Sequence, residues 1–202
     1  MAGVLKRSFF DRDTTLVARQ LIGMRLVRIL PDGHRLSGTI VETEAYLPGD
    51  AASHACRGPS QRNAAMFMQA GTSYVYFTYG VHFCFNIVTE CAGQPAAVLI
   101  RSLEPDEGIE QMRQYRMKHR HRAIAKHELC RGPACVCQAL QIDRTLDRYD
   151  MLQGGSILFV EQDTSRPDHE VCNTPRIRVR GDQQALDRLW RWAIKDNACV
   201  SR

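Results

Sequence analysis

The sequence predicts one α+β domain over residues 1–202, built mainly from a curved antiparallel sheet of hairpins surrounded by helices. Three observations support this fold class. The chain is long enough to bury one substantial core without dividing into several. Its β-prone runs come in pairs joined by short turns, which is the pattern typical of hairpins. Strands and helices do not alternate regularly, as a parallel α/β sheet would require.

The first half of the chain predicts one helix followed by hairpins. Asp13 is a suitable N-cap for a helix that Gly23 stops. Turn-forming residues at 31–33 and at Gly80 each join two antiparallel strands. The expected elements are, in order, a helix over 14–22, strands over 24–30 and 36–46, a loop over 48–71, strands over 74–79 and 82–88, and a strand over 96–103.

The second half predicts more helix. Pro105, followed by two acidic residues, suits the first turn of a helix, where a proline loses no hydrogen bond and negative charge complements the dipole. Gly132 and Pro133 open a further helix that runs to about Leu140. Beyond it we expect strands over 156–161 and 176–180, a polar loop between them, and a helix over 183–192.

The charge of the chain favours an acidic partner. Its formal net charge is +5, and basic side chains crowd the segment from Arg113 to Arg131, where Glu128 is the single acid. Such a local field attracts a polyanion such as nucleic acid, with salt-dependent binding. A solvated helix face explains the same basic run equally well.

The eight cysteines are expected to be reduced thiols. The first residues lack the apolar core and cleavage site of a secretory leader, and no apolar run is long enough to cross a bilayer. We therefore expect an intracellular protein, in a bacterial cytoplasm rather than a nucleus. The spacing of Cys130, Cys135 and Cys137 does not match a structural zinc site, so we expect no metal and buried thiols instead.

Several chemistry-bearing residues share strand faces. Side chains two apart on a strand point the same way, as Glu44 and Tyr46 do on one expected strand. If the strands are neighbours, a carboxylate, tyrosines, an amide and a guanidinium converge on one pocket, which suits a flat, polar, aromatic ligand. Alternatively, Glu44 pairs with a surface arginine and the tyrosines only favour strand formation. The other pairs that share a face are Tyr74 with Tyr76, His82 with Asn86, and Leu99 with Arg101.

A series of ordered motifs resembles the alkyladenine (3-methyladenine) DNA glycosylase family. The series includes GTIVETEAY at 38–46, GTSYVYFTYG at 71–80, CFN at 84–86 and VLIR at 98–101. The resemblance covers nearly the whole chain, and the segment after Trp190 matches more loosely. Because the blocks follow one another in the same order, they are far more specific than one short motif.

The resemblance implies a monofunctional enzyme without a cofactor that acts on double-stranded DNA containing damaged purines. We expect a monomer, since the protein would scan DNA. Glu44 would be the general base that activates water, and Arg101 would hold that water and the carboxylate. Tyr79, at a hairpin tip, would fill the gap that the flipped base leaves in the duplex. The base-binding pocket would contain Tyr46, His54 and Tyr76 as the walls of a slot, Asn86 as the group that excludes the amino group of guanine, Leu99, and Val179, which would give a backbone contact to the water.

Some positions depart from the family pattern. His82 stands where the family often has an aromatic residue such as tyrosine, and Arg178 stands where it usually has glycine. Arg178 could bind a phosphate or simply be exposed. Two residues are also inserted between Asn86 and Arg101, so the turn there is expected to differ.

Three other functions remain open. A bifunctional glycosylase–lyase needs an amine in the pocket, and no lysine falls in the matched blocks. A zinc nucleobase deaminase needs a Pro-Cys-x-x-Cys motif, whereas residues 133–137 are PACVC. A non-catalytic binder of distorted DNA would keep Tyr79 and the basic run without needing Glu44.

Overall fold

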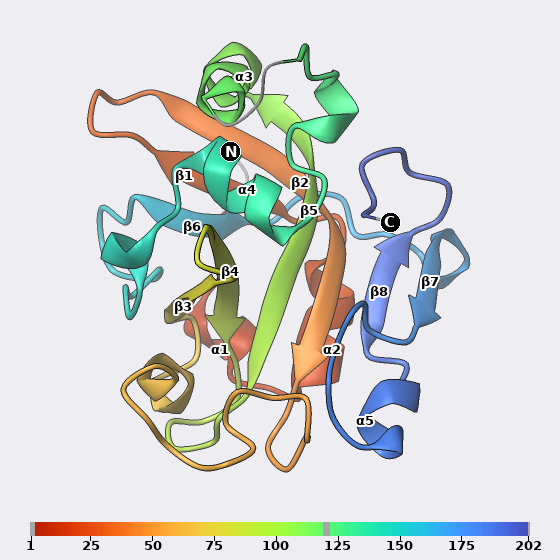
Figure 1. The fold of residues 1–202 in the computed structure, drawn as a ribbon. Helices are drawn as coiled ribbons and strands as arrows, with labels where there is room; N and C mark the ends of the chain where they lie inside the picture. Colours follow the sequence, from red (N-terminus) through yellow and green to blue (C-terminus); the bar gives the residue numbers. More distant parts are fainter. Residues whose placement is uncertain (1–2, 119–121, 202) are drawn as a thin grey trace.

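One curved sheet forms the centre of the molecule (Figure 1). The computed structural model describes residues 3–118 and 122–201, and within them eight strands join in antiparallel pairs. Six strands run in the order β3-β4-β5-β2-β1-β6, while β8 pairs with β2 and β7 pairs with β8. The predicted α+β domain with hairpins is therefore confirmed. The strands are β1 Arg25–Ile29, β2 Arg35–Tyr46, β3 Ser73–Thr78, β4 His82–Val88, β5 Ala97–Glu107, β6 Leu158–Glu161, β7 Val171–Thr174 and β8 Arg191–Ile194.

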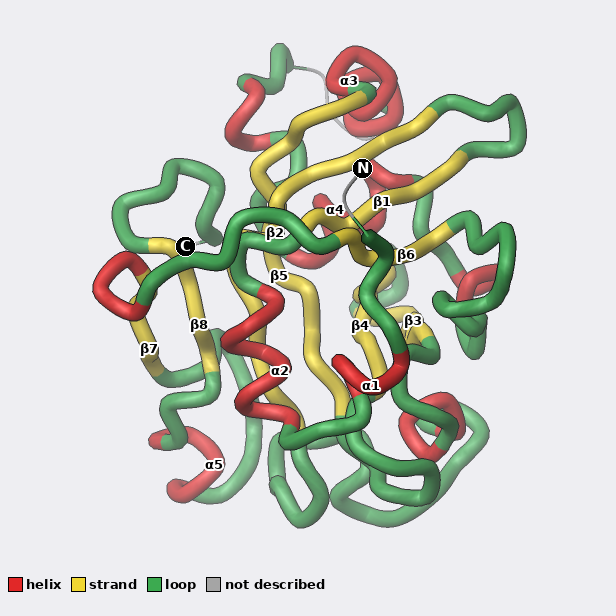
Figure 2. The backbone as a smooth tube through the Cα atoms, turned by 180° about the vertical axis from the view of Figure 1, so that it is seen from behind, coloured by secondary structure: helices red, strands yellow, loops and turns green. Residues whose placement is uncertain are grey.

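Short helices surround the sheet. The Asp13 carboxylate caps α2 as predicted, accepting a hydrogen bond from the Leu16 amide at 2.9 Å. Helix α2 packs against β2 and β5 (Figure 2), and α4 packs against β4 and β5. The helices are α1 Arg7–Phe10, α2 Thr14–Leu21, α3 Ile109–Met117, α4 Pro133–Leu140 and α5 Gln183–Asp187, with 3-10 turns η1 Ala64–Phe67, η2 Lys126–Glu128, η3 Arg144–Leu146 and η4 Asp168–Glu170.

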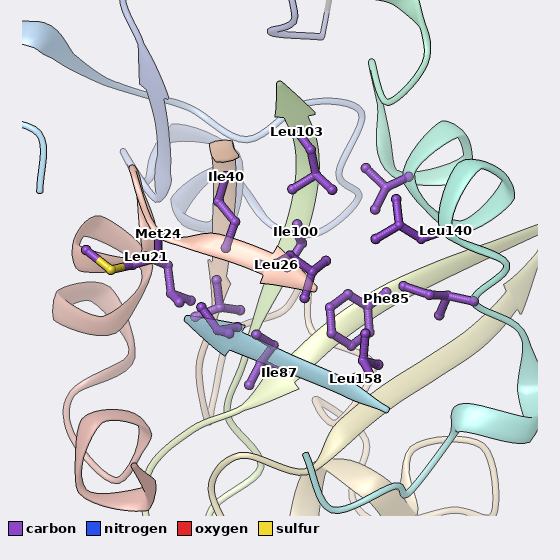
Figure 3. Close-up of a cluster of buried hydrophobic side chains, with 14 of the residues drawn as sticks. Leu21, Met24, Leu26, Ile40, Phe85, Ile87, Ile100, Leu103, Leu140 and Leu158 are labelled. Carbon is purple, nitrogen blue, oxygen red and sulfur yellow. The ribbon is translucent and has the colours of Figure 1, made fainter. Parts of the chain in front are cut away.

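The main hydrophobic core holds the central strands in place (Figure 3). Phe85 of β4 and Ile100 of β5 are completely buried, and they pack with side chains from α2, α4, β1, β2 and β6. Burying one such side chain contributes about 1.5–3 kcal/mol, and truncating a buried phenylalanine to alanine typically costs about 3–5 kcal/mol. The strands that carry the candidate site therefore rest on a tightly packed support.

The strand register brings the sequence-predicted site residues into one row. Glu44 of β2 lies opposite Leu99 of β5, Leu99 lies opposite Asn86 of β4, and Asn86 lies opposite Tyr74 of β3. The β2–β5 pairing shifts register on either side of Glu42. An irregularity of this kind bends the strand locally and is typical of positions that redirect a side chain.

The helix predicted from Pro105 begins later. Strand β5 continues through Pro105 to Glu107, and α3 starts at Ile109 after Gly108, whose φ is 73°. Pro105 pairs with Gly38 at a register shift, where the ladder is already interrupted and a missing amide proton costs little. The acidic residues that suggested a helix start instead pair across the sheet, as Glu107 does with Arg35 at 2.5 Å.

The expectations for residues 171–194 are wrong in part, although a helix does begin at Gln183 as expected. Residues 176–180 form no strand, whereas β7 occupies a segment expected to be a polar loop. Helix α5 ends at Asp187, and Arg191–Ile194 is strand β8 rather than helix. Pairing with β2 explains the difference, because it buries Trp192 and Ala193 against the sheet and outweighs local helix propensity.

The basic run is not one helical face. Helix α3 carries only its first part, and His119, Arg120 and His121 lie outside the described residues. Arg116 is buried and donates to Gln138, while Arg122 pairs with Glu128 at 2.5 Å. Much of this positive charge is therefore engaged in internal contacts rather than presented as one surface. Over residues 3–118 and 122–201, no helix is long and apolar enough to cross a membrane.

Candidate functional site

A pocket of about 910 Å³ opens where β2, β3, β4 and β5 meet the segment 177–180 and the start of α4. Tyr74, His82 and Arg178 reach it, together with all the expected pocket residues. Glu44 lies behind the wall that Tyr46 and Arg101 form, with no exposed surface. The expected residues at the pocket are Tyr46, His54, Tyr76, Tyr79, Asn86, Leu99, Arg101 and Val179, and others that line it include Met66, Cys84, Arg131, Cys135, Ile177, Arg180 and Ser201.

Three donors fix the buried carboxylate of Glu44. The Ile177 amide donates to Oε1 at 2.8 Å, and the Tyr46 hydroxyl donates to Oε2 at 2.8 Å. The Arg101 Nη1 lies 3.1 Å from Oε1. A carboxylate has about four acceptor positions, so these contacts set its orientation and leave it able to accept a further hydrogen bond.

Arg101 bridges two buried carboxylates. Its Nη1 faces Glu44, and its Nε donates to Glu42 Oε1 at 2.9 Å. Burial alone would lower the pKa of Arg101, but the Glu44 and Glu42 carboxylates more than offset burial and raise it. For Glu42, burial acts to raise the pKa, while Arg101, the Ser201 amide and Arg191 outweigh it and lower the pKa. The Glu42 carboxylate and the Arg101 guanidinium therefore both stay charged at neutral pH.

Aromatic rings form one wall of the pocket. The ring centroids of Tyr74 and Tyr76 lie 5.4 Å apart, and His54 meets Tyr76 edge-on at 4.4 Å. The Tyr74 hydroxyl lies 2.8 Å from His54 Nδ1. Burial, with Arg62 nearby, lowers the pKa of His54 to about 4, so the imidazole is neutral at neutral pH. These groups offer apolar ring surface with a few polar atoms at the edge.

A side-chain amide holds the loop that carries His54. Asn63 Nδ2 donates to the carbonyls of His54 and Gly58, both at 2.9 Å, and its Oδ1 accepts from the Ser60 amide at 2.6 Å. Three backbone groups of this loop would otherwise lack these partners, and buried backbone groups are costly to leave unpaired. Asn63 therefore explains how a segment without regular structure positions an imidazole.

Tyr46 has a cation on one side of its ring. The Arg176 guanidinium carbon lies 4.7 Å from the Tyr46 ring centroid. Arg176 is itself held by Asp50, whose Oδ1 accepts from Nη2 at 3.0 Å, and by the Ala45 carbonyl at 3.0 Å. Both ion-pair side chains are completely buried. Tyr46 is thus fixed by stacking as well as by its hydrogen bond to Glu44.

The β3–β4 hairpin presents a protruding aromatic residue. Tyr79 is 82% exposed and has a φ of 50°, in the left-handed region that non-glycine residues rarely adopt. Gly80 follows with a φ of 69°. Val81, also largely exposed, gives the hairpin tip an apolar surface. An exposed aromatic side chain held by a strained backbone is a common feature of functional sites.

The segment 176–180 contributes a backbone hydrogen-bond donor and positively charged side chains to the site. The Ile177 amide donates to Glu44, and Val179, which is expected to give a backbone contact to the water, lines the pocket. Arg178 has a φ of 54°, which agrees with the family's preference for glycine there. Together with Arg131 and Arg180, Arg178 places guanidinium groups along a lining that, among the described residues, includes no acidic side chain.

Several residues that contribute to the site were not predicted from the sequence. Glu42 is two residues from Glu44, so the alternation that singled out Glu44 and Tyr46 could have found it. Ile177 and Ser201 contact residues 133 and 159 positions away, and no local pattern signals contacts of that kind. Asn86 lines the pocket, and its Nδ2 donates to the Tyr74 carbonyl at 3.0 Å.

The cysteines do not form a metal site in the described part of the chain. Across those residues, no group of three or more His, Cys, Asp or Glu side chains is arranged to hold a metal ion. Cys130 and Cys137 are buried in the core, and burial raises the pKa of both thiols. Cys135 lies at the pocket instead. Two of the three thiols in this cluster are therefore core residues, as expected.

Comparison with known proteins places this geometry in a family. The family model described as methylpurine-DNA glycosylase matches residues 8–198, which includes every site residue above except Ser201. The chain belongs to the methylpurine-DNA glycosylase family. The relationship extends over almost all of the described fold, so it covers the pocket and the strands that support it.

Similar proteins come from bacteria, an archaeon and a mammal. A putative 3-methyladenine DNA glycosylase of Herpetosiphon aurantiacus is 40% identical over 201 residues, covering 100% of this chain and 90% of the relative. One of Methanocella arvoryzae with the same description is 45% identical, covering 98% and 96%. The DNA-3-methyladenine glycosylase of Mus musculus is 48% identical over 163 residues, covering 77% of this chain and 48% of the mouse protein.

Proposed function

We propose that the protein is a monofunctional DNA glycosylase of base excision repair. It flips an alkylated or deaminated purine out of duplex DNA and hydrolyses the N-glycosidic bond, leaving an abasic site. The observation that carries the proposal is the buried Glu44 carboxylate, held by Arg101, Tyr46 and Ile177 directly behind an aromatic pocket. Membership of the family and the mouse relative's name, DNA-3-methyladenine glycosylase, support the same activity.

The pocket recognises the flipped base by stacking and by a few edge contacts. Tyr46 and Tyr76 provide ring faces, which attract a cationic alkylated purine by about 0.5–2 kcal/mol. When the Tyr74 hydroxyl donates to Nδ1 of neutral His54, Nε2 carries the ring proton and donates to an acceptor on the lesion. Asn86, held by the Tyr74 carbonyl, opposes the exocyclic amino group of an undamaged guanine.

Glu44 performs the chemical step. As the bond from C1′ to the purine nitrogen breaks, its electron pair leaves with the base and the sugar gains oxocarbenium character. The carboxylate stabilises that charge and accepts a proton from the water whose oxygen attacks C1′. Arg101 and the Ile177 amide orient the carboxylate for this role. A purine that already carries an alkyl group and positive charge leaves as a neutral base.

The surroundings of the pocket fit a duplex substrate. Tyr79 would enter the stack in place of the flipped nucleotide, and Arg131, Arg178 and Arg180 would face the phosphates. The described residues that line the pocket include no lysine to form a Schiff base, which supports hydrolysis without lyase activity. We propose a monomer acting where genomic DNA is found, in a bacterial cytoplasm.

A base-release assay tests the proposal. Duplexes carrying 3-methyladenine, 7-methylguanine, hypoxanthine or ethenoadenine are incubated with wild type, Glu44→Gln and the control Glu107→Gln. Glu107 is a carboxylate on β5 that pairs with Arg35 away from the pocket. Release by wild type and Glu107→Gln, with none by Glu44→Gln despite retained lesion binding, is the expected result. Unchanged release by Glu44→Gln contradicts the catalytic assignment, and borohydride trapping of a covalent complex contradicts the absence of lyase activity.

A further inference from the structure

We propose that Glu42 and Ser201 are positioning residues that fix Arg101 against the catalytic carboxylate. Protein donors occupy both oxygens of the buried Glu42 carboxylate, whereas Glu44 can accept a further hydrogen bond, so Glu42 would act through Arg101 rather than on the substrate. The inference rests on the proposed function of Glu44. In this proposal, Glu42 orients the Arg101 guanidinium, which in turn orients the Glu44 carboxylate.

Five hydrogen-bond donors converge on Glu42. Oε1 accepts from Arg101 Nε at 2.9 Å, from Arg191 Nε at 2.7 Å and from the Ser201 hydroxyl at 2.8 Å. Oε2 accepts from the Ser102 hydroxyl and from the Ser201 amide, both at 2.8 Å. A carboxylate satisfied from so many directions has one orientation, and it transmits that orientation to its partners.

The charges in this cluster are balanced. Two carboxylates, Glu42 and Glu44, are matched by two guanidinium groups, Arg101 and Arg191. Arg101 lies between the carboxylates and is almost fully buried, so it has little water to turn toward. Without the negative charge on Glu42, both guanidinium groups would have only Glu44 to neutralise them. Arg101 would then lose the contact on Nε that sets the plane of its head group.

Ser201, the last described residue, contacts both Glu42 and Arg101. Its hydroxyl donates to Glu42 Oε1 and accepts from Arg101 Nη2 at 3.1 Å, so one proton direction satisfies both partners. The preceding carbonyl, of Val200, accepts from Arg131 Nε at 2.9 Å. Ser201 also lines the pocket. This segment therefore links the ion-pair cluster to the pocket wall.

The register shift in β2 explains why Glu42 can reach this cluster. Glu42 stands at an irregular point of the β2–β5 pairing and also pairs with Ala193 of β8. Ser102, its partner on β5, and Arg191, which lies two residues before its partner on β8, supply donors to the carboxylate. A carboxylate that served only to join strands would not need to share Arg101 with Glu44.

The first experiment separates positioning from folding. Glu42→Gln keeps the size of the side chain but places an amide donor among donors. We expect the single-turnover rate of base release to fall on the order of 10²-fold, the typical cost of a displaced catalytic group. The concentration of enzyme that gives half-maximal rate should stay within about twofold, since the substrate contacts are unchanged. The control Glu107→Gln removes a paired carboxylate on β5 away from the pocket and should retain the wild-type rate.

The second variant keeps the proposal testable if Glu42→Gln does not fold. Ser201→Ala removes one hydroxyl and leaves the Ser201 amide on Glu42. We expect its single-turnover rate to fall about 3- to 10-fold, the usual value of one hydrogen bond, with half-saturation unchanged. In the Glu42→Gln background the same substitution should cause a smaller further loss than in wild type, because the hydroxyl acts in part through Glu42 and in part through its own contact with Arg101.

Clear outcomes overturn the proposal. They are a wild-type rate in either variant, a loss confined to half-saturation, or losses that multiply in the double variant. Loss of rate in Glu42→Gln equal to that in Glu107→Gln would also overturn it. Release by Glu44→Gln would instead remove the proposed function itself. Inactive Glu44→Gln beside fully active Glu42→Gln would reject only the positioning role.

Discussion

The Tyr46 hydroxyl donates to Oε2 of Glu44 at 2.8 Å, so two side chains of β2 separated by one residue are joined at the candidate centre. Burial, and then the neighbouring Glu44 charge, raise the pKa of Tyr46 well above its usual range. The phenol therefore stays protonated and remains a donor throughout the neutral range. This contact leads to the first of four predictions.

Tyr46→Phe should slow base release about 10-fold, because it removes one hydrogen bond to a charged group and keeps the ring. Single-turnover kinetics on a lesion-bearing duplex measure the effect. Lesion affinity should change little, since the Phe ring still stacks. A variant with full rate would mean that the hydroxyl does not help to orient Glu44.

Tyr79→Ala should weaken the preference for damaged over intact duplex while leaving the free energy of unfolding within about 0.5 kcal/mol of wild type. The side chain is 82% exposed, so its loss removes little packing. Competition binding with matched lesion and undamaged duplexes measures the preference. Tyr79→Phe, which keeps the ring, should behave as wild type, and an unaltered preference in Tyr79→Ala would argue against insertion into the base stack.

Acid should destabilise the fold through His54. Desolvation at the pocket wall, and then the nearby Arg62 charge, lower the pKa of its imidazole from 6.5 in the unfolded chain to about 4 in the folded protein. As the pH falls, the unfolded chain binds this proton first, so stability that is fully present above 6.5 is lost between about 6.5 and 4. Melting temperatures of wild type and His54→Gln across this range test the point. The variant should show the shallower decline, and parallel curves would contradict the prediction.

Arg178→Gly should make DNA binding less sensitive to salt. The Arg178 guanidinium lines the pocket and forms no ion pair with any described residue, so it is available to a phosphate. The slope of log affinity against log salt concentration should become shallower by about one. Thermal stability should not fall, because glycine adopts the φ of 54° without strain. The control Arg19→Gln, whose native side chain pairs with Asp168, should keep the wild-type slope.

The hairpins could be predicted from the sequence because their signals are local. The turn at Gly80 predicts two antiparallel strands over 74–79 and 82–88, and the structure pairs them, with Tyr74 opposite Asn86. The strands β7 and β8 were not predictable in the same way. Trp192 is in a strand because β2 offers an unpaired edge beside Thr43, which is a tertiary condition that no window of sequence contains.

The residues of the candidate site also differ in whether a local pattern in the sequence could identify them. The alternation in VETEAY, together with the family resemblance, identified Glu44 and Tyr46, whose contact lies within one strand. The Ile177 amide and the Ser201 hydroxyl could not be identified from residue type, because a backbone amide carries no side-chain signature and a serine is common in loops. The backbone contact of Val179 to the water stays a prediction, and the segment that carries Val179 is not the strand that was expected.

The wide separation along the chain of the groups around Glu44 has a consequence for folding. Hairpins such as β3–β4 close locally and can form early, whereas the Ile177 contact closes a span of 133 residues and the Ser201 contact with Glu42 closes one of 159. We thus expect the β3–β4 part of the aromatic slot to form before the Glu44 carboxylate gains all its hydrogen-bond donors. We therefore expect the orientation of Glu44 to depend on the folding of almost the whole chain, so truncation after β5 would leave the carboxylate without the Ile177 amide.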